Sequence, residues 1–168
     1  MKMKRILLAL VAALAITACI TPEERAARQA ENLKMVKASV AGQKYKITVN
    51  EMTPMRGSSM TVTGGRYLKV DSTLLECSLP YLGRDDIPHL KSHAQRRQDA
   101  NIEFKSEVRQ YLVQYRPKEK SAVITFKATY GVDEYTFTIK VDDAGRARIH
   151  LVPKDRDYID YEGHVVAL

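Results

Sequence analysis

The alternation of apolar and polar residues constrains the fold of this chain more than any other feature of its sequence. Across residues 45–151, apolar residues recur at every second position in short runs that end at turn-forming residues. The most regular run places Tyr135, Phe137, Ile139 and Val141 between polar residues. A side-chain period of two is typical of a β-strand with one buried face and one wet face. The sequence therefore predicts antiparallel strands rather than a helical fold.

The runs predict about eight or nine strands joined by short turns. They cover residues 45–49, 66–70, 74–79, 102–104, 108–115, 122–130, 135–141, 147–151 and 158–161. The sequence Asp142-Asp143-Ala144-Gly145 is typical of a hairpin turn with glycine at a position of positive φ. Close, regular spacing of strands favours an all-β antiparallel meander, either closed into a barrel or folded into a sandwich.

One helix is predicted before the strands, from Thr21 to Gly42. Thr21 and Glu24 have the spacing of a capping box, Pro22 suits the first helical position, and Gly42 is a typical terminator. The apolar stripe is thin and consists of Ala26, Ala30, Leu33, Val36 and Val40. A stripe this weak at its start predicts a stalk that docks only through its second half.

The N-terminus has the organisation of a secretory signal. A basic opening, residues 1–5, precedes the apolar run Ile6 to Ile16, which is too short to span a membrane stably. The run ends in Ile16-Thr17-Ala18-Cys19, which resembles the lipobox of bacterial lipoproteins. That resemblance implies cleavage before Cys19 and attachment of acyl chains such as palmitate to this residue.

This signal sets the predicted organisation and location of the chain. Residues 1–18 form the lipoprotein signal peptide, residues 19–42 the lipid-anchored cysteine and helical stalk, and residues 43–168 the β-domain. The membrane is then a partner through Cys19. Because Ile20 follows the cysteine where an aspartate favours inner-membrane retention, the location expected is the cell envelope, at the outer membrane.

Charge and motifs narrow the possible functions. The net charge of +7 from 27 basic and 20 acidic residues falls to +4 once Lys2, Lys4 and Arg5 leave with the signal. This mild balance and export argue against a nucleic-acid partner. The chain has no Gly-x-Ser-x-Gly elbow and no phosphate-binding loop, so no catalytic residue and no cofactor is predicted.

With Cys19 committed to lipid, Cys77 is left without a disulfide partner in the mature chain. It alternates in phase with Leu75 and Leu79, which predicts a buried and unreactive thiol.

Three motifs carry a resemblance to a known family. They are Pro54-Met55-Arg56-Gly57, Tyr67-Leu68-Lys69-Val70 and Leu79-Pro80-Tyr81-Leu82-Gly83-Arg84. From about Val40 to the C-terminus the chain resembles a Bacteroidetes family of small exported proteins, many of them lipoproteins, classed only as a domain of unknown function. The resemblance implies a lipocalin-like β-barrel and brings no established activity. The chain departs from the family pattern at Leu82, where an aromatic residue is usual, and in the loop from Asp85 to Gln98.

A count of strand directions places several of these residues on one rim, opposite the N-terminal helix. The candidate binding rim consists of Arg56, Gly57, Tyr81, Gly83 and Arg84. The two arginines are able to hold an anionic group through forked hydrogen bonds. The alternative is that each arginine ties down its own turn by bonding backbone carbonyls.

Two other groups of polar residues invite a functional interpretation. His89 and His93, with Asp85 and Asp86, are weak candidates for a metal site, although Pro88 interrupts any helix and no HExxH motif is present. The stripe of Arg146, Arg148 and His150 suits anionic headgroups or polysaccharide, or is simply the wet face of a sheet. Alternation places Asp160 and Glu162 on the outer face of the last strand.

The sequence therefore favours a lipid-anchored envelope protein of unknown molecular function, acting as a non-catalytic binding or interaction module for a small ligand or an envelope protein. The alternatives are a structural envelope protein and a metal-dependent hydrolase that uses the 85–93 loop.

Overall fold

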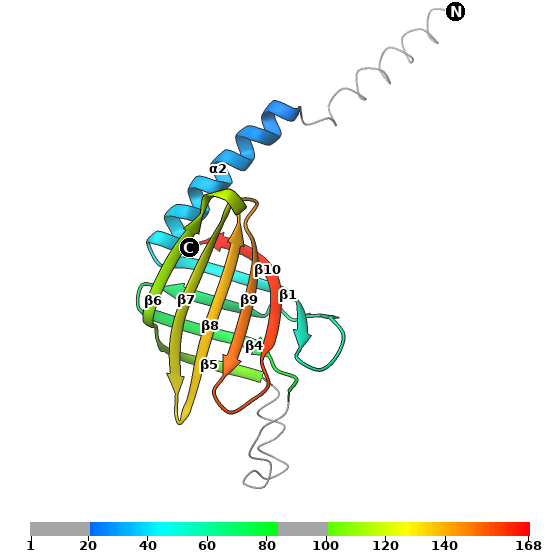
Figure 1. Cartoon of the computed structure of the whole chain (residues 1–168), viewed down its shortest axis with the longest axis vertical. Helices are drawn as coiled ribbons and strands as arrows, with labels where there is room; N and C mark the ends of the chain where they lie inside the picture. The colour runs from blue at the N-terminus through cyan, green and yellow to red at the C-terminus, as the bar shows by residue number, and fades with distance from the viewer. Residues whose placement is uncertain (1–20, 84–100) are drawn as a thin grey trace, which may run out of the picture.

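The structure is a computed structural model of the 168-residue chain, and it describes residues 21–83 and 101–168. Antiparallel strands form most of the described chain, and one long helix precedes them (Figure 1). The predictions of an all-β fold and of an N-terminal helix are confirmed at this level.

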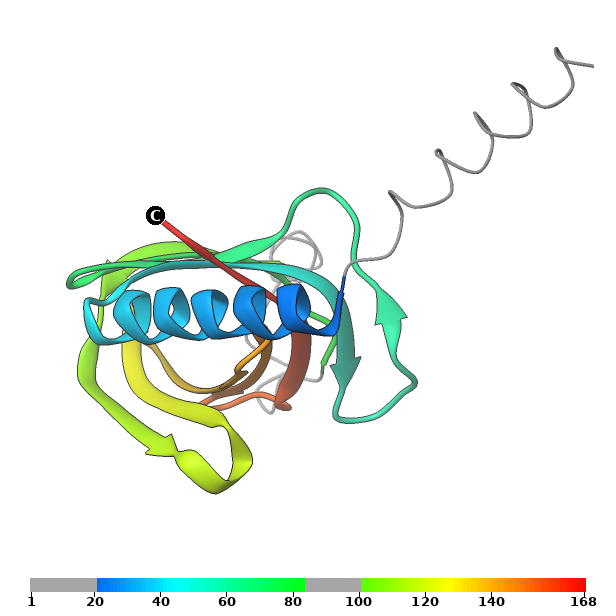
Figure 2. The same cartoon turned by 90° about the horizontal axis from the view of Figure 1, so that it is seen from above.

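Helix α2 (Pro22–Ala41) begins as its sequence predicts. Thr21 caps it, the Thr21 hydroxyl accepts a hydrogen bond from the backbone N–H of Glu24, and the Glu24 carboxylate accepts one from the backbone N–H of Thr21. Val36 and Val40 are buried, whereas residues 22–32 are exposed. The helix lies across one end of the sheet and projects beyond it (Figures 1 and 2). Within the described ranges, no helix has the length and apolar character needed to cross a membrane.

Ten strands follow the helix. They are β1 (Lys44–Pro54), β2 (Met60–Thr61), β3 (Tyr67–Asp71), β4 (Leu74–Pro80), β5 (Asn101–Glu107), β6 (Arg109–Arg116), β7 (Ser121–Tyr130), β8 (Asp133–Asp142), β9 (Arg146–Pro153) and β10 (Ile159–Ala167), with a short 3₁₀ turn, η2 (Pro117–Glu119), between β6 and β7.

The sheet is an antiparallel meander whose last strand pairs with its first. The strand order is β5-β4-β3-β1-β10-β9-β8-β7-β6, and β2 pairs with β1 outside this path. The sheet curls strongly, so that strands β6 to β10 cross in front of β1, β3, β4 and β5 (Figures 1 and 2). This curled half-barrel is the barrel-like architecture that the described residues show.

The sequence predicted only the first part of β10. Residues 158–161 were the predicted strand, but β10 runs from Ile159 to Ala167 and is the strand that joins β1 to β9. Gly163 interrupts the apolar alternation, and the run 165–167 has no alternation at all. Because of both features, the residue pattern does not reveal that this segment is a strand. Its pairing with β1 defines it instead.

The two ends of the sheet, β5 and β6, form no backbone ladder with each other in the part of the chain that the structure describes. Instead, the Ser106 hydroxyl of β5 donates a hydrogen bond to the Thr129 carbonyl of β7 over 2.6 Å. The Phe104 ring stacks on Tyr130, with ring centroids 5.3 Å apart. Tyr130 is 54% exposed, although it is in phase with the inward residues of β7, because it is the last residue of that strand.

The inward residues of every long strand form one core. Tyr45, Phe126, Phe137 and Tyr161 are its largest fully buried side chains. Cys77 is buried as predicted, and burial raises the pKa of its thiol far above the usual range. The protonated thiol is the less nucleophilic form, so the structure supports the predicted inertness of Cys77.

Candidate functional site

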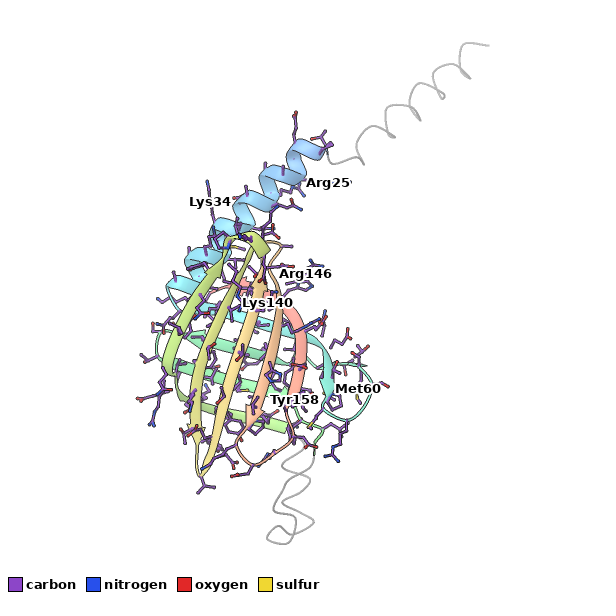
Figure 3. All side chains as sticks on the ribbon, viewed as in Figure 1. Arg25, Lys34, Met60, Lys140, Arg146 and Tyr158 are labelled. Carbon is purple, nitrogen blue, oxygen red and sulfur yellow. The ribbon has the colours of Figure 1, made fainter. Side chains whose placement is uncertain are left out.

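The loops at the end of the sheet opposite α2 meet as the strand-direction count predicts. The backbone N–H of Met55 donates to the Tyr158 carbonyl over 3.2 Å, and the Tyr81 hydroxyl donates to the Asp157 carbonyl over 2.9 Å. Met60 and Tyr158 lie toward this end, far from the helix (Figure 3). We call this cluster of loops the distal end.

Tyr81 and Gly83 of the candidate rim hold the distal end together. A Cβ atom on Gly83 would lie 2.5 Å from the Tyr81 hydroxyl oxygen and 3.2 Å from the Asp157 Cβ, so only glycine fits. Tyr81 is buried and its hydroxyl bonds the backbone of Asp157. The Pro-Tyr-x-Gly motif is thus explained by packing between two loops.

Of the other three rim residues, the structure describes Arg56 and Gly57. Arg56 and Gly57 are exposed, and Gly57 has a φ of +153° that favours glycine. Arg84 lies outside the described residues, as do the lipid-attachment candidate Cys19 and the metal candidates Asp85, Asp86, His89 and His93.

An ion pair between a buried arginine and a partly exposed aspartate adds a further contact at the distal end. The guanidinium of Arg156, whose side chain is 8% exposed, donates to the Asp133 carboxylate over 3.2 Å and lies 5.7 Å from the centroid of the Tyr81 ring. Tyr135 also donates to Asp133, and burial together with this carboxylate raises the pKa of Tyr135 well above its usual range. These contacts join the start of β8, the β9–β10 loop and Tyr81 at the distal end.

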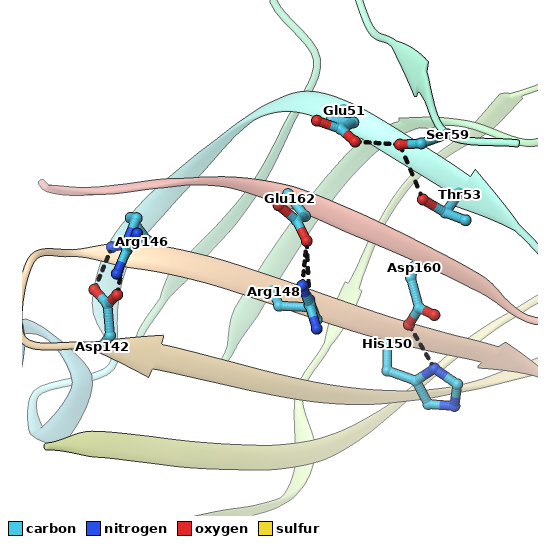
Figure 4. A network of polar contacts seen from close by, with 9 residues as sticks. All are labelled: Glu51, Thr53, Ser59, Asp142, Arg146, Arg148, His150, Asp160 and Glu162. Carbon is cyan, nitrogen blue, oxygen red and sulfur yellow. Dashed lines mark hydrogen bonds and ion pairs between the residues drawn. The ribbon is translucent and has the colours of Figure 1, made fainter. Parts of the chain in front are cut away.

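The predicted basic stripe is neutralised by acids on neighbouring strands (Figure 4). Arg148 pairs with Glu162, and His150 lies 2.7 Å from Asp160, each across the β9–β10 ladder. Arg146 pairs with Asp142 at 2.7 Å. Asp160 and Glu162 therefore lie on the outer face as predicted, and the stripe is a paired surface rather than a free cationic site.

A groove that the sequence did not predict lies at the opposite end, between α2 and the sheet. It has a volume of about 190 Å³. We call it the helix-side groove; it is lined by Leu33, Val36, Lys37, Tyr115, Arg116, Pro117, Lys120, Ser121, Ala122, Val141 and Asp142. Its walls come from the second half of α2, from the β6–β7 hairpin and from the end of β8. The weak stripe of α2 gave the only sequence signal, because it predicted where the helix docks.

The groove combines an apolar wall with an uncompensated polar rim. Within the described ranges, Lys37 and Lys120 form no ion pair, and the buried Ser121 hydroxyl has no hydrogen-bond partner. An unsatisfied buried hydroxyl costs about 1–3 kcal/mol, so the Ser121 hydroxyl is expected to destabilise the fold.

Replacing Ser121 with alanine is therefore expected to raise the free energy of unfolding of the ligand-free protein, by up to about 1 kcal/mol. Ser106→Ala is the matched control, because it removes a hydroxyl that is bonded to Thr129 and should lower the same quantity by about 1 kcal/mol. Urea unfolding of the two variants measures both changes. A loss of stability in Ser121→Ala would mean that this hydroxyl has a partner in solution.

Comparisons with known proteins address the fold and the family. The family model described as "Domain of unknown function (DUF4251)" matches residues 27–165. The crystal structure of a DUF4251 family protein from Bacteroides eggerthii DSM 20697 aligns with a TM-score of 0.64 at 10% sequence identity, covering 83% of this chain and 91% of that chain. At this identity the likeness shows a shared fold alone. No curated protein matches the sequence. The predicted resemblance to a family of unknown function is confirmed at that level.

Proposed function

This chain belongs to the DUF4251 family, and we propose that it is a lipid-anchored protein of the bacterial cell envelope that acts as a non-catalytic binding module. The observation that carries the binding role is the helix-side groove. It joins an apolar wall to two lysines that form no ion pair within the described ranges. Apolar concavities with a few convergent polar groups are the usual form of ligand sites.

The geometry of α2 supports the anchor. Its capping box fixes the start of the helix at Thr21, two residues after Cys19, and the exposed residues 22–32 separate that point from the sheet. At 1.5 Å per residue, this exposed part extends for about 16 Å. Such a helix suits a stalk that holds the β-domain at a distance from an acylated Cys19, at the outer membrane.

The anchor is tested by replacing Cys19 with alanine in the full chain. We expect the wild-type chain to incorporate labelled palmitate and to sediment with the outer-membrane fraction. Cys19→Ala should lose the label completely and either leave the membrane or accumulate with its signal uncleaved. Cys77→Ala is the control and should keep both properties. Normal processing and sedimentation of Cys19→Ala would disprove the anchor.

The metal-dependent hydrolase is the alternative, and its candidate ligands lie in the 85–93 loop outside the described residues. Within the described ranges, no group of three or more His, Cys, Asp or Glu side chains is placed to hold a metal ion. Metal analysis of the purified full chain separates the two functions, since a stoichiometric divalent ion would favour the hydrolase. A structural envelope protein would instead be recognised by co-purifying partners without small-molecule binding.

We also propose that the sheet behaves as a closed, lipocalin-like barrel. The support comes from the side chains that bridge β5 to β7, namely the Ser106–Thr129 hydrogen bond and the stacking of Phe104 on Tyr130 and on Tyr135. In this arrangement α2 covers one end of the barrel, and the groove lies beside that cover.

A further inference from the structure

We propose that the free edge of strand β6 pairs with β6 of a second copy of this chain, antiparallel and about a two-fold axis at Gln114. The partner is therefore a β-strand of identical sequence. The proposal goes beyond the binding role proposed above, and it needs neither the helix-side groove nor the lipid anchor.

Strand β6 ends the sheet, and among the described elements only β7 lies along it (Figures 1 and 2). In an edge strand, the backbone N–H and C=O groups of every second residue point away from the sheet and accept a further strand. The opposite end of the sheet is better protected. There β5 carries Glu103, Lys105 and Glu107 at alternate exposed or outward positions, and Ser106 ties it to the Thr129 carbonyl.

The edge of β6 lacks this protection. Its regular part, residues 112–116, contains no proline, lysine or acidic residue. Leu112 is 54% exposed and Tyr115 is 46% exposed. A strand edge with exposed apolar side chains and no blocking residue is a site where strands associate. The irregularity between Arg109 and Leu112 limits the regular ladder to these five residues.

The side chains of β6 fit a second copy of themselves. An axis at Gln114 is the one two-fold register that pairs all five residues of the regular part. It places Gln114 opposite its own copy, Val113 opposite Tyr115, and Leu112 opposite Arg116, so an apolar side chain meets an aromatic ring on one face and an aliphatic arginine stem on the other.

Charge also favours an identical partner over an oppositely charged one. Arg116 is the only ionisable cation within residues 112–116, and it is already paired with Glu119 at 3.3 Å. In the proposed register no like charges lie opposite each other, so nothing repels the second copy. Two-fold pairing of one surface with itself is the commonest form of self-association. A ladder of five residues buries less than the roughly 1,200–2,000 Å² of a stable interface, so we expect a weak dimer that forms as concentration rises.

The test uses Gln114→Cys in the purified full chain, oxidised with copper phenanthroline. Directly opposite residues of an antiparallel pair have Cα atoms about 4.5–5.5 Å apart, which is within reach of a disulfide. We expect a covalent dimer, and mass spectrometry of the linked peptides should find residue 114 of both copies. The native Cys77 is buried and should not contribute.

Leu112→Cys is the matched control, because Leu112 is exposed on the same strand and the same face as Gln114. In the proposed register the two copies of residue 112 are offset by four residues, or about 13 Å. This variant should therefore form at least about tenfold less dimer. Equal cross-linking of the two variants, or cross-linking of Leu112→Cys alone, would overturn the proposal. So would a disulfide from residue 114 only to another protein when Gln114→Cys is oxidised in cells.

Charge variants test the pairing without a covalent link. Gln114→Lys and Gln114→Glu each place like charges opposite each other in a dimer of identical chains, and each should weaken dimerisation by about twofold to fivefold in sedimentation equilibrium. An equimolar mixture places lysine opposite glutamate and should restore it. Val152→Lys and Val152→Glu make the same changes at an exposed position of β9 and should leave dimerisation unchanged, alone or mixed. A monomer at every concentration, or a mixture that dimerises no better than its components, would overturn the proposal.

Discussion

Replacing Gly163 with alanine is expected to lower the free energy of unfolding by about 3 kcal/mol or more. Gly163 is buried in β10 directly opposite Val49 of β1. A Cβ atom there would lie 2.1 Å from the Thr48 carbonyl oxygen and 3.1 Å from the Val49 Cα. Both contacts are with backbone, so no side-chain rotation relieves them. The two strands would have to separate at the β-bulge between Val49 and Glu51.

Thermal and urea unfolding measure this effect, and about 3 kcal/mol corresponds to a fall in Tm of roughly 6–12 °C for a domain of this size. His164→Ala is the matched control, because His164 is the exposed neighbour of Gly163 and its loss should change stability by less than about 0.5 kcal/mol. Equal stability of the two variants would mean that β1 and β10 are not paired in this register. The sheet would then be open at its centre.

The sequence predicted best those strands in which apolar and polar side chains alternate regularly. In β8 and β9 every inward position is apolar and every outward position except Val152 is polar, so the period of two identifies both the strand and its buried face. The same argument placed Cys77 in the core. The helix was equally readable, because a capping box is a local device that involves residues three apart.

The parts that the sequence did not predict depend on contacts between distant segments. The pairing of β10 with β1 is visible only when Gly163 is seen against the backbone of Thr48. The helix-side groove brings Leu33 and Val36 beside Ser121 and Val141, and none of these residues has a distinctive neighbour in the sequence. Pro117 and Lys120, in the turn between β6 and β7, also line the groove, although no motif in the sequence marks them.

The candidate binding rim shows that a sequence motif does not by itself predict the role of its residues. A motif such as Pro-Tyr-x-Gly stands out in a sequence whether its residues bind a ligand or hold two loops together. The structure gives Tyr81 and Gly83 the second role, through the Asp157 carbonyl and the absence of space at Gly83. Physical chemistry predicted where these residues lie, since strand directions follow from counting turns. It did not predict their role, because that depends on which groups the neighbouring loop presents.

The interior of the sheet gives the second large effect. Phe137→Ala is expected to lower the free energy of unfolding by about 3–5 kcal/mol. Phe137 is fully buried and stacks on Phe126 with ring centroids 4.9 Å apart, and Phe126 stacks in turn on Tyr111. Removing the ring would leave a cavity lined by aromatic and aliphatic side chains, and the surrounding strands are too constrained by their ladders to collapse into it.

The size of this loss distinguishes a solid core from a ligand-holding interior. A lipocalin-like barrel that carries its ligand inside would have Phe137 as part of a cavity wall, where truncation enlarges existing space and costs little. In a filled core the full cost appears, and the new cavity should bind a small apolar probe such as benzene that the wild-type protein rejects. Leu112→Ala, at an exposed position of β6, should cost less than about 0.5 kcal/mol and is the control. A cost below about 1 kcal/mol for Phe137→Ala would place a ligand inside the sheet, whereas the full cost would show that the interior is filled and that any ligand binds outside it.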